Sequence, residues 1–165
     1  MQIFDRYTDL LDWMKRKGND PRVMGHTLDG SPIACWQSGG DKKPAIFISA
    51  GSHSTEQAGV TAAVELIDQL ETDHQIYVIP CRDPMGMNGF SYALSLSLGE
   101  EPELGSVEDS EEILKDSGEV LYQDEETLLV IIGEYGYSTS GLYGRFSPGE
   151  AFLEPLVGRR IFFPS

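Results

Sequence analysis

A histidine and a glutamate three residues apart are the side chains of this sequence best suited to chemistry. They lie in the stretch Ser49-Ala-Gly-Ser-His53-Ser-Thr-Glu56. On a turn or a first helical turn, residues i and i+3 face the same way, so one imidazole and one carboxylate can reach a single cation. A catalytic zinc held by histidines and a carboxylate keeps one position for water and lowers the pKa of that water. The pattern alone is weak, because Glu56 can equally be a favourable acid at a helix start and His53 a loop histidine without a ligand.

Two strands and a helix are expected to position this pair. The run Ala45–Ser49 is apolar without alternation, which is typical of a strand buried on both faces. Residues Gln57 to Leu70 have apolar side chains at helical spacing, and Ile76–Ile79 is a second buried strand. A strand, a helix and a strand in this order predict a crossover unit with parallel strands. The pair then lies at the carboxyl edge of the sheet, where open α/β sheets bind ligands.

The first part of the chain predicts a helix followed by a hairpin. Ile3 to Lys17 reads as an amphipathic helix, with Gly18 at the position of a left-handed cap. Its apolar positions are Tyr7, Leu10, Leu11 and Met14. The segments Arg22–Leu28 and Pro32–Gln37 are joined by Asp29-Gly30, a strong hairpin signal.

Beyond residue 90 the patterns are weaker. We expect a short helix at Ser91–Leu98, an acidic surface insertion at 99–118, and a second hairpin from Glu119–Tyr122 and Thr127–Ile132. Gly133–Gly149 is rich in Gly, Ser and Tyr and is expected to be a loop. The chain stops in an apolar, strand-like run at 161–165. We therefore expect one domain over 1–165 that is incomplete at its C-terminal end.

Length and charge exclude several classes of function. The chain has 165 residues, enough for one medium domain, and a net charge of −15. A chain this acidic repels phosphate backbones and anionic lipid, so we expect no nucleic-acid and no membrane partner. The N-terminus lacks the pattern of a signal peptide. The two cysteines, Cys35 and Cys81, are expected to be free thiols, which suits a cytoplasmic protein.

Three segments in order resemble the motifs of the zinc metallocarboxypeptidases (carboxypeptidase A-like). Residues Val23–Ile33 are similar to the family's G-x-S-x-x-G-R-P-I hairpin, Gly51–Glu56 to its zinc-binding H-x-x-E loop, and Ile79–Gly86 to its P-x-x-N-P-D-G loop. The resemblance covers residues 22 to 90. It implies an α/β fold with a mixed, partly parallel sheet and flanking helices. It also implies that His53 and Glu56 are ligands of Zn²⁺ in an enzyme that hydrolyses an amide bond near a free carboxylate.

The sequence departs from the family's pattern at several positions. Ser31 stands where the family has arginine, and Asp83 and Met85 stand where it has asparagine and aspartate. The family's third ligand is a histidine far downstream, and this chain has none after His74. The family's substrate-binding arginines and general-base glutamate have no convincing match. Either the catalytic half lies outside this chain or the site is altered, and the catalytic residues stay unassigned.

Three other residues have side chains that are candidates for the third ligand. His74 precedes the second parallel strand, which places it roughly 16 Å from His53 at the opposite edge of the sheet. His26 belongs to the hairpin, where the family has no ligand. Asp83 follows the second strand at the correct edge and is the one in-chain candidate that we keep. It is more simply explained as a loop carboxylate that pairs with Arg82 or turns the chain.

Three further groups have both a functional and a simpler explanation. Arg82 could neutralise a substrate carboxylate, although a surface salt bridge explains it more simply. Glu134 follows a late strand, as a general base would, but the family's order places the missing histidine before that base. Tyr135, Tyr137 and Tyr143 could cover a pocket or be surface aromatics. Cys35 is best explained as a small core residue.

The sequence leaves three candidate functions. The first is a zinc-dependent hydrolase of the metallocarboxypeptidase type acting on a peptide. The second is a deacylase of the succinylglutamate desuccinylase or aspartoacylase kind, acting on an N-acyl amino acid. The third is a non-catalytic scaffold or binding domain with an incomplete metal site. Self-association stays open.

Overall fold

The computed structural model describes residues 2–17, 20–53, 56–125, 127–139 and 160–162. The chain divides into two compact units, Met1–Asn88 and Gly89–Ser165. Each unit contains a four-stranded sheet and helices, and each sheet mixes parallel and antiparallel pairs. The expected α/β class with a mixed, partly parallel sheet and flanking helices is confirmed.

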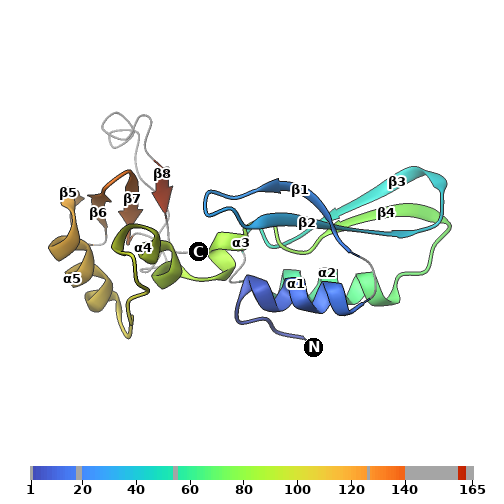
Figure 1. Ribbon diagram of the computed structural model, residues 1–165, viewed down its shortest axis with the longest axis horizontal. Helices are drawn as coiled ribbons and strands as arrows, with labels where there is room; N and C mark the ends of the chain where they lie inside the picture. Colours follow the sequence, from blue (N-terminus) through green and yellow to red (C-terminus); the bar gives the residue numbers. More distant parts are fainter. Residues whose placement is uncertain (1, 18–19, 54–55, 126, 140–159, 163–165) are drawn as a thin grey trace. The chain divides into compact units, whose positions relative to one another are not determined.

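The sheet of the first unit has the strand order β1-β2-β4-β3 (Figure 1). Neighbours β1–β2 and β2–β4 are antiparallel, and β3 and β4 are parallel. Helix α2 connects β3 to β4, so the expected crossover unit is present. The strands are β1 (Arg22–His26), β2 (Pro32–Gly39), β3 (Lys42–Ser49) and β4 (His74–Ile79).

The hairpin between β1 and β2 forms as predicted. The Asp29 carboxylate accepts the backbone N–H of Ser31 at 3.1 Å, and Gly30 has a φ of 84° that favours glycine. The register pairs Arg22 with Cys35 and His26 with Pro32. The hairpin therefore sets the register of β1 and β2 at one edge of the sheet.

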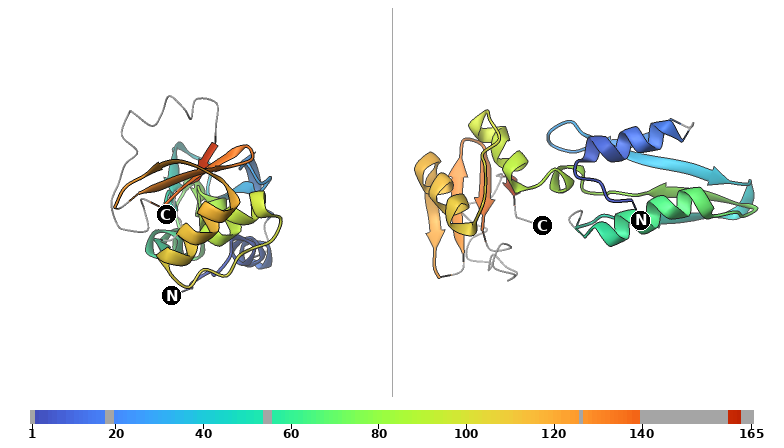
Figure 2. Two further views of the ribbon diagram at one scale, coloured as in Figure 1. Left: turned by 90° about the vertical axis from the view of Figure 1, so that its left-hand side faces the viewer. Right: turned by 90° about the horizontal axis from the view of Figure 1, so that it is seen from below.

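Two helices, α1 (Tyr7–Arg16) and α2 (Gln57–Gln69), cover one face of this sheet (Figures 1 and 2). Helix α1 begins at Tyr7 rather than at Ile3. The carboxylate of Asp9 accepts the Arg6 backbone N–H at 3.0 Å, which caps the helix there. The expected cap residue Gly18 lies outside the described residues. The core between helices and sheet is made of Phe4, Tyr7, Leu10, Met14, Ala34, Trp36, Val60, Ala63, Val64, Ile76, Val78, Cys81 and Met87.

Strand β3 corrects one expectation from the sequence. The run Ala45–Ser49 is not buried on both faces, because β3 lies at the edge of the sheet and α1 and α2 cover one face. Ile48 packs against the core, whereas Phe47 is 62% exposed. An apolar run indicates a strand but not how many neighbours the strand has. The prediction of burial was therefore wrong, although that of a strand was right.

The second unit contains α4, α5 and a sheet of order β5-β6-β7-β8, in which β7 and β8 are parallel. The helix expected at Ser91–Leu98 and the hairpin of Glu119–Tyr122 with Thr127–Ile132 are present. The elements are α4 (Phe90–Leu98), α5 (Val107–Ser117), β5 (Glu119–Gln123), β6 (Leu128–Ile132), β7 (Tyr135–Ser138) and β8 (Arg160–Phe162).

Two segments of this unit are more ordered than expected. The acidic stretch 99–118 contains α5, whose Leu114 is fully buried in the core of the second unit. Strand β7 occupies part of the expected loop Gly133–Gly149, and the buried Tyr137 donates to the Ala93 carbonyl at 3.1 Å. Composition alone did not indicate these packed positions. None of the helices in the described part of the chain is both long and apolar enough to cross a membrane.

Candidate metal site

The carboxyl ends of β3 and β4 are joined by main-chain hydrogen bonds. The Ala50 N–H donates to the Ile79 carbonyl at 2.9 Å. The N–H groups of Arg82 and Asp83 donate back to the carbonyls of Ala50 and Gly51, at 3.0 Å in each case. The segment after β3 and the segment after β4 therefore form one edge, as parallel strands require.

Gly51 permits this close approach. Its φ is 61°, in the left-handed region that favours glycine. A Cβ atom at this position would lie 2.8 Å from the Cα atom of Cys81 and 3.0 Å from the Pro80 carbonyl oxygen. The glycine thus fixes where the chain leaves β3 on its way to His53.

A main-chain hydrogen bond joins His53 and Glu56 shortly after this glycine. The Glu56 N–H donates to the His53 carbonyl at 3.0 Å. Glu56 is also the N-cap residue of α2. Both residues are exposed, and neither side chain has a hydrogen-bond or ion-pair partner within the described residues. One imidazole and one carboxylate are therefore available at the same edge.

Asp83 lies at this edge but has another role. Its carboxylate accepts the Gly86 N–H at 3.0 Å and caps the short helix α3 (Pro84–Met87). The simpler explanation, that it turns the chain before Pro84, is confirmed. The neighbouring Arg82 is exposed, and the ion pairs of the described residues do not include it.

The buried Cys81 is an unsuitable ligand next to this site. Burial raises the pKa of its thiol from 9.0 to about 12, with hydrogen bonding to Asp83 as a smaller, opposing effect. A metal binds the thiolate, and this thiol is neutral at pH 7. Cys35 is also buried, and both cysteines are free, as expected.

This thiol predicts an alkaline loss of stability. The folded state keeps Cys81 neutral, whereas the unfolded chain ionises it above about pH 9, so the stabilisation is complete below pH 9 and declines towards pH 12. We expect Cys81 alone to lower the free energy of unfolding by up to about 1.4 kcal/mol per pH unit in this range. Burial also raises the pKa of Tyr7 from 10.0 to about 12, which adds to the decline above pH 10. Both tryptophans, Trp13 and Trp36, lie in the first unit, so their fluorescence during urea unfolding reports on it. Cys81→Ala should reduce the dependence of the free energy of unfolding on pH above pH 9. An unchanged dependence would contradict the assignment of this loss to Cys81.

His74 is not brought to this edge. His74 begins β4 opposite Lys42, at the amino end of the strand, and its Nδ1 lies 2.8 Å from the Pro44 carbonyl oxygen. His26 is exposed on β1. Glu134 is exposed on the turn between β6 and β7 of the second unit. Tyr143 lies outside the described residues.

The donor set fits zinc in kind but not in number. Imidazole nitrogen and carboxylate oxygen are both zinc ligands, and a catalytic site uses three protein ligands. Within the part of the chain that the structure describes, no cluster of three or more His, Cys, Asp or Glu side chains could hold a metal. His53 and Glu56 supply two of the three protein donors that such a site uses.

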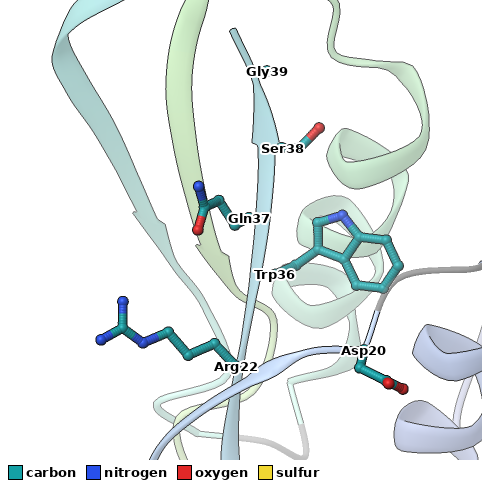
Figure 3. A pocket seen from close by; sticks show the side chains of 6 residues that line it. All are labelled: Asp20, Arg22, Trp36, Gln37, Ser38 and Gly39. Carbon is teal, nitrogen blue, oxygen red and sulfur yellow. The ribbon is translucent and has the colours of Figure 1, made fainter. Parts of the chain in front are cut away.

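A shallow hollow of about 300 Å³ lies elsewhere on the sheet of the first unit (Figure 3). It lies along the part of β2 that extends past Arg22, the first residue of β1, where β2 pairs with residues 75–78 of β4. Arg22 and Gln37 lie on one side of β2 and Trp36 on the other. No pattern in the sequence indicated these residues. The hollow is lined by Asp20, Arg22, Trp36, Gln37, Ser38 and Gly39, and it does not include the candidate metal ligands.

Comparisons with known proteins give a limited structural likeness. No protein-family model matches the chain, and no curated protein matches it either. Among solved structures, bovine thrombin-activatable fibrinolysis inhibitor, in complex with tick carboxypeptidase inhibitor, matches with a TM-score of 0.43 and 14% identity. The match covers 53% of this chain and 33% of that chain, so the chain spans about a third of that protein's length.

Proposed function

We propose that this chain supplies two ligands, His53 and Glu56, to the zinc site of a hydrolase of the metallocarboxypeptidase type. The observation that carries the proposal is the main-chain hydrogen bond from the Glu56 N–H to the His53 carbonyl. This bond holds two residues that carry an imidazole and a carboxylate close together at the carboxyl edge of parallel strands. The resemblance of residues 22 to 90 to the family's motifs supports the same assignment.

The surrounding residues suit an anionic substrate. Zinc, when bound, activates a water molecule for attack on an amide carbonyl. Arg82 lies on the segment bonded to Gly51 and carries an exposed guanidinium, which can bind a carboxylate through two parallel hydrogen bonds. The substrate class is therefore a peptide or an N-acyl amino acid with a free carboxylate next to the scissile amide.

A third ligand is needed for full activity. Because the described residues offer two donors, we expect the 165-residue chain by itself to bind zinc weakly and to show little or no peptidase activity. A non-catalytic scaffold with an incomplete metal site is the second candidate function, favoured by the same observation. A deacylase is the third, and it would share His53 and Glu56.

Zinc content and hydrolysis assays test this proposal together. We expect the purified chain to take up zinc and Glu56→Ala to lose that uptake, whereas Glu65→Ala, at an exposed carboxylate of α2, should retain it. No uptake, or equal uptake by all three proteins, would remove the metal site. Assays with peptides and N-acyl amino acids separate peptidase from deacylase. Robust turnover by the chain alone would contradict the need for a third ligand.

A further inference from the structure

Residues 2–6, which we call the N-terminal segment, bond to the start of α2. The Gln57 side-chain amide donates to the Phe4 carbonyl at 3.1 Å, and the Thr61 hydroxyl donates to the Gln2 carbonyl at 2.7 Å. Gln57 and Thr61 are four residues apart, so both lie on the same side of α2. The N-terminal segment therefore holds the first two turns of α2 at two points, and it lies beside that helix in Figure 2.

The N-terminal segment is itself anchored within the first unit. Phe4 is buried, and its ring meets that of Trp13 edge to face with the centroids 6.3 Å apart. The Arg6 guanidinium donates to the Asn88 carbonyl, and the Tyr7 N–H donates to the Asn88 side-chain oxygen at 3.0 Å. Asn88 directly follows α3, on the segment that leaves β4. The N-terminal segment thus links the start of α2 to the segment after β4.

These bonds join the two segments of the candidate metal edge a second time. The first junction is the hydrogen bond of 3.0 Å from the Asp83 N–H to the Gly51 carbonyl. The second runs from Gln57 through the N-terminal segment to Asn88. In the sequence, Glu56 lies between Gly51 and Gln57, next to the latter. Its main chain is therefore held from both sides.

The start of α2 has little support from its own residues. Glu56 is the N-cap residue, but within the described residues its side chain makes no capping hydrogen bond. The third residue of the helix is Gly59, and glycine disfavours helix formation. The first turn of an uncapped helix frays readily. Because the N-terminal segment holds this turn, the Glu56 carboxylate is not needed as a cap and is left available for a metal.

We propose that the N-terminal segment positions Glu56 for metal binding, with Gln57 as the positioning residue. This inference rests on the proposed function, in which Glu56 is a zinc ligand. Gln57 acts through the main chain, because its side chain ties the first residue of α2 to Phe4. A ligand whose main chain is already ordered loses less conformational freedom when the metal binds. Loss of the bond between Gln57 and Phe4 should therefore weaken zinc binding although no ligand is removed.

Gln57→Leu tests this role, with Tyr7→Phe as the matched control. Gln57→Leu removes the donor to the Phe4 carbonyl. Tyr7→Phe removes the hydroxyl that donates to the Pro32 carbonyl at 2.5 Å, a hydrogen bond of the same unit that does not involve α2. Both variants should be less stable than the wild type, because each leaves a carbonyl without its donor. We expect Gln57→Leu to weaken zinc affinity several-fold, less than Glu56→Ala does, and Tyr7→Phe to leave it unchanged.

Amide exchange in the metal-free protein gives a second readout. The Glu56 N–H donates to the His53 carbonyl, and its exchange with solvent, measured by NMR, reports how well this main chain is ordered. We expect this exchange to be several-fold faster in Gln57→Leu and unchanged in Tyr7→Phe. An unchanged rate in Gln57→Leu would overturn the proposal, and so would a zinc affinity equal to that of the wild type.

The two readouts distinguish this inference from the proposed function. If the wild type takes up no zinc but exchange at Glu56 is faster in Gln57→Leu, the zinc site is rejected and the ordering of Glu56 by Gln57 is supported. If the wild type binds zinc and Gln57→Leu binds it equally well, the zinc site stands and the role of Gln57 is rejected.

Discussion

Gly51→Ala is expected to destabilise the first unit by about 2–4 kcal/mol. Two effects add. An alanine at a φ of 61° costs about 1–2 kcal/mol relative to glycine, and its Cβ would lie 2.8 Å from the Cα atom of Cys81. This second effect is a contact with a main-chain atom, which cannot rotate away as a side chain can. The edge that carries His53 would have to open, so metal uptake should fall together with stability.

Gly59→Ala is the matched control. Gly59 lies within α2, and a Cβ at this position would meet nothing within 4 Å. Because alanine favours helices over glycine, this variant should be more stable by about 0.5–1 kcal/mol. Urea unfolding followed by tryptophan fluorescence measures both variants. If Gly51→Ala were as stable as Gly59→Ala, the close approach of the two segments would be wrong.

His53→Ala and Glu56→Ala should each weaken zinc affinity by at least about tenfold, or about 1.4 kcal/mol. Each substitution removes one of the two donors that the edge provides, and a metal held by few ligands cannot compensate. Competition with a coloured zinc chelator measures the dissociation constants. Since both side chains are exposed and have no partner within the described residues, neither substitution should change the stability of the metal-free protein beyond ±0.5 kcal/mol.

Two control variants match these substitutions in chemistry but remove side chains of other elements. His26→Ala removes an exposed imidazole on β1, and Glu65→Ala removes an exposed carboxylate on α2. Both should leave the zinc dissociation constant unchanged. A loss of affinity in His26→Ala equal to that in His53→Ala would mean that zinc binds surface histidines without selection.

Local patterns in the sequence predicted most elements of the first unit. The spacing of Tyr7, Leu10 and Met14 predicted the buried side of α1, and all three are at most 2% exposed. Asp29-Gly30 predicted the hairpin because the hydrogen bond and the backbone conformation that form its turn involve neighbouring residues alone. Features of this kind depend on residues that are close together in the sequence, so a single sequence contains the information that predicts them.

Features that depend on distant neighbours could not be predicted in the same way. The apolar run of β3 was expected to be buried, but the number of strands beside it is a property of the whole sheet. Tyr137 was expected in a loop because Gly and Ser surround it, yet its hydroxyl lies 2.6 Å from Ser97 Oγ, forty residues away. Composition cannot register such a contact.

The candidate site shows the same division. Strand, glycine and helix predicted His53 and Glu56 at one edge, and in the structure a main-chain hydrogen bond joins the two residues. Asp83 was a third candidate from the sequence, and the structure shows that its carboxylate accepts a hydrogen bond from the Gly86 N–H. No pattern in the sequence indicated the hollow around Trp36, because its lining residues share no motif.

X-ray absorption at the zinc edge of the metal-loaded chain tests the central claim most directly. We predict a first shell of nitrogen and oxygen at about 2.0–2.2 Å, with the outer-shell scattering of one imidazole that disappears in His53→Ala. Scattering from sulfur at about 2.3 Å would place the metal on a cysteine, and an imidazole signal that survives His53→Ala would place it on another histidine. Either result would contradict the account.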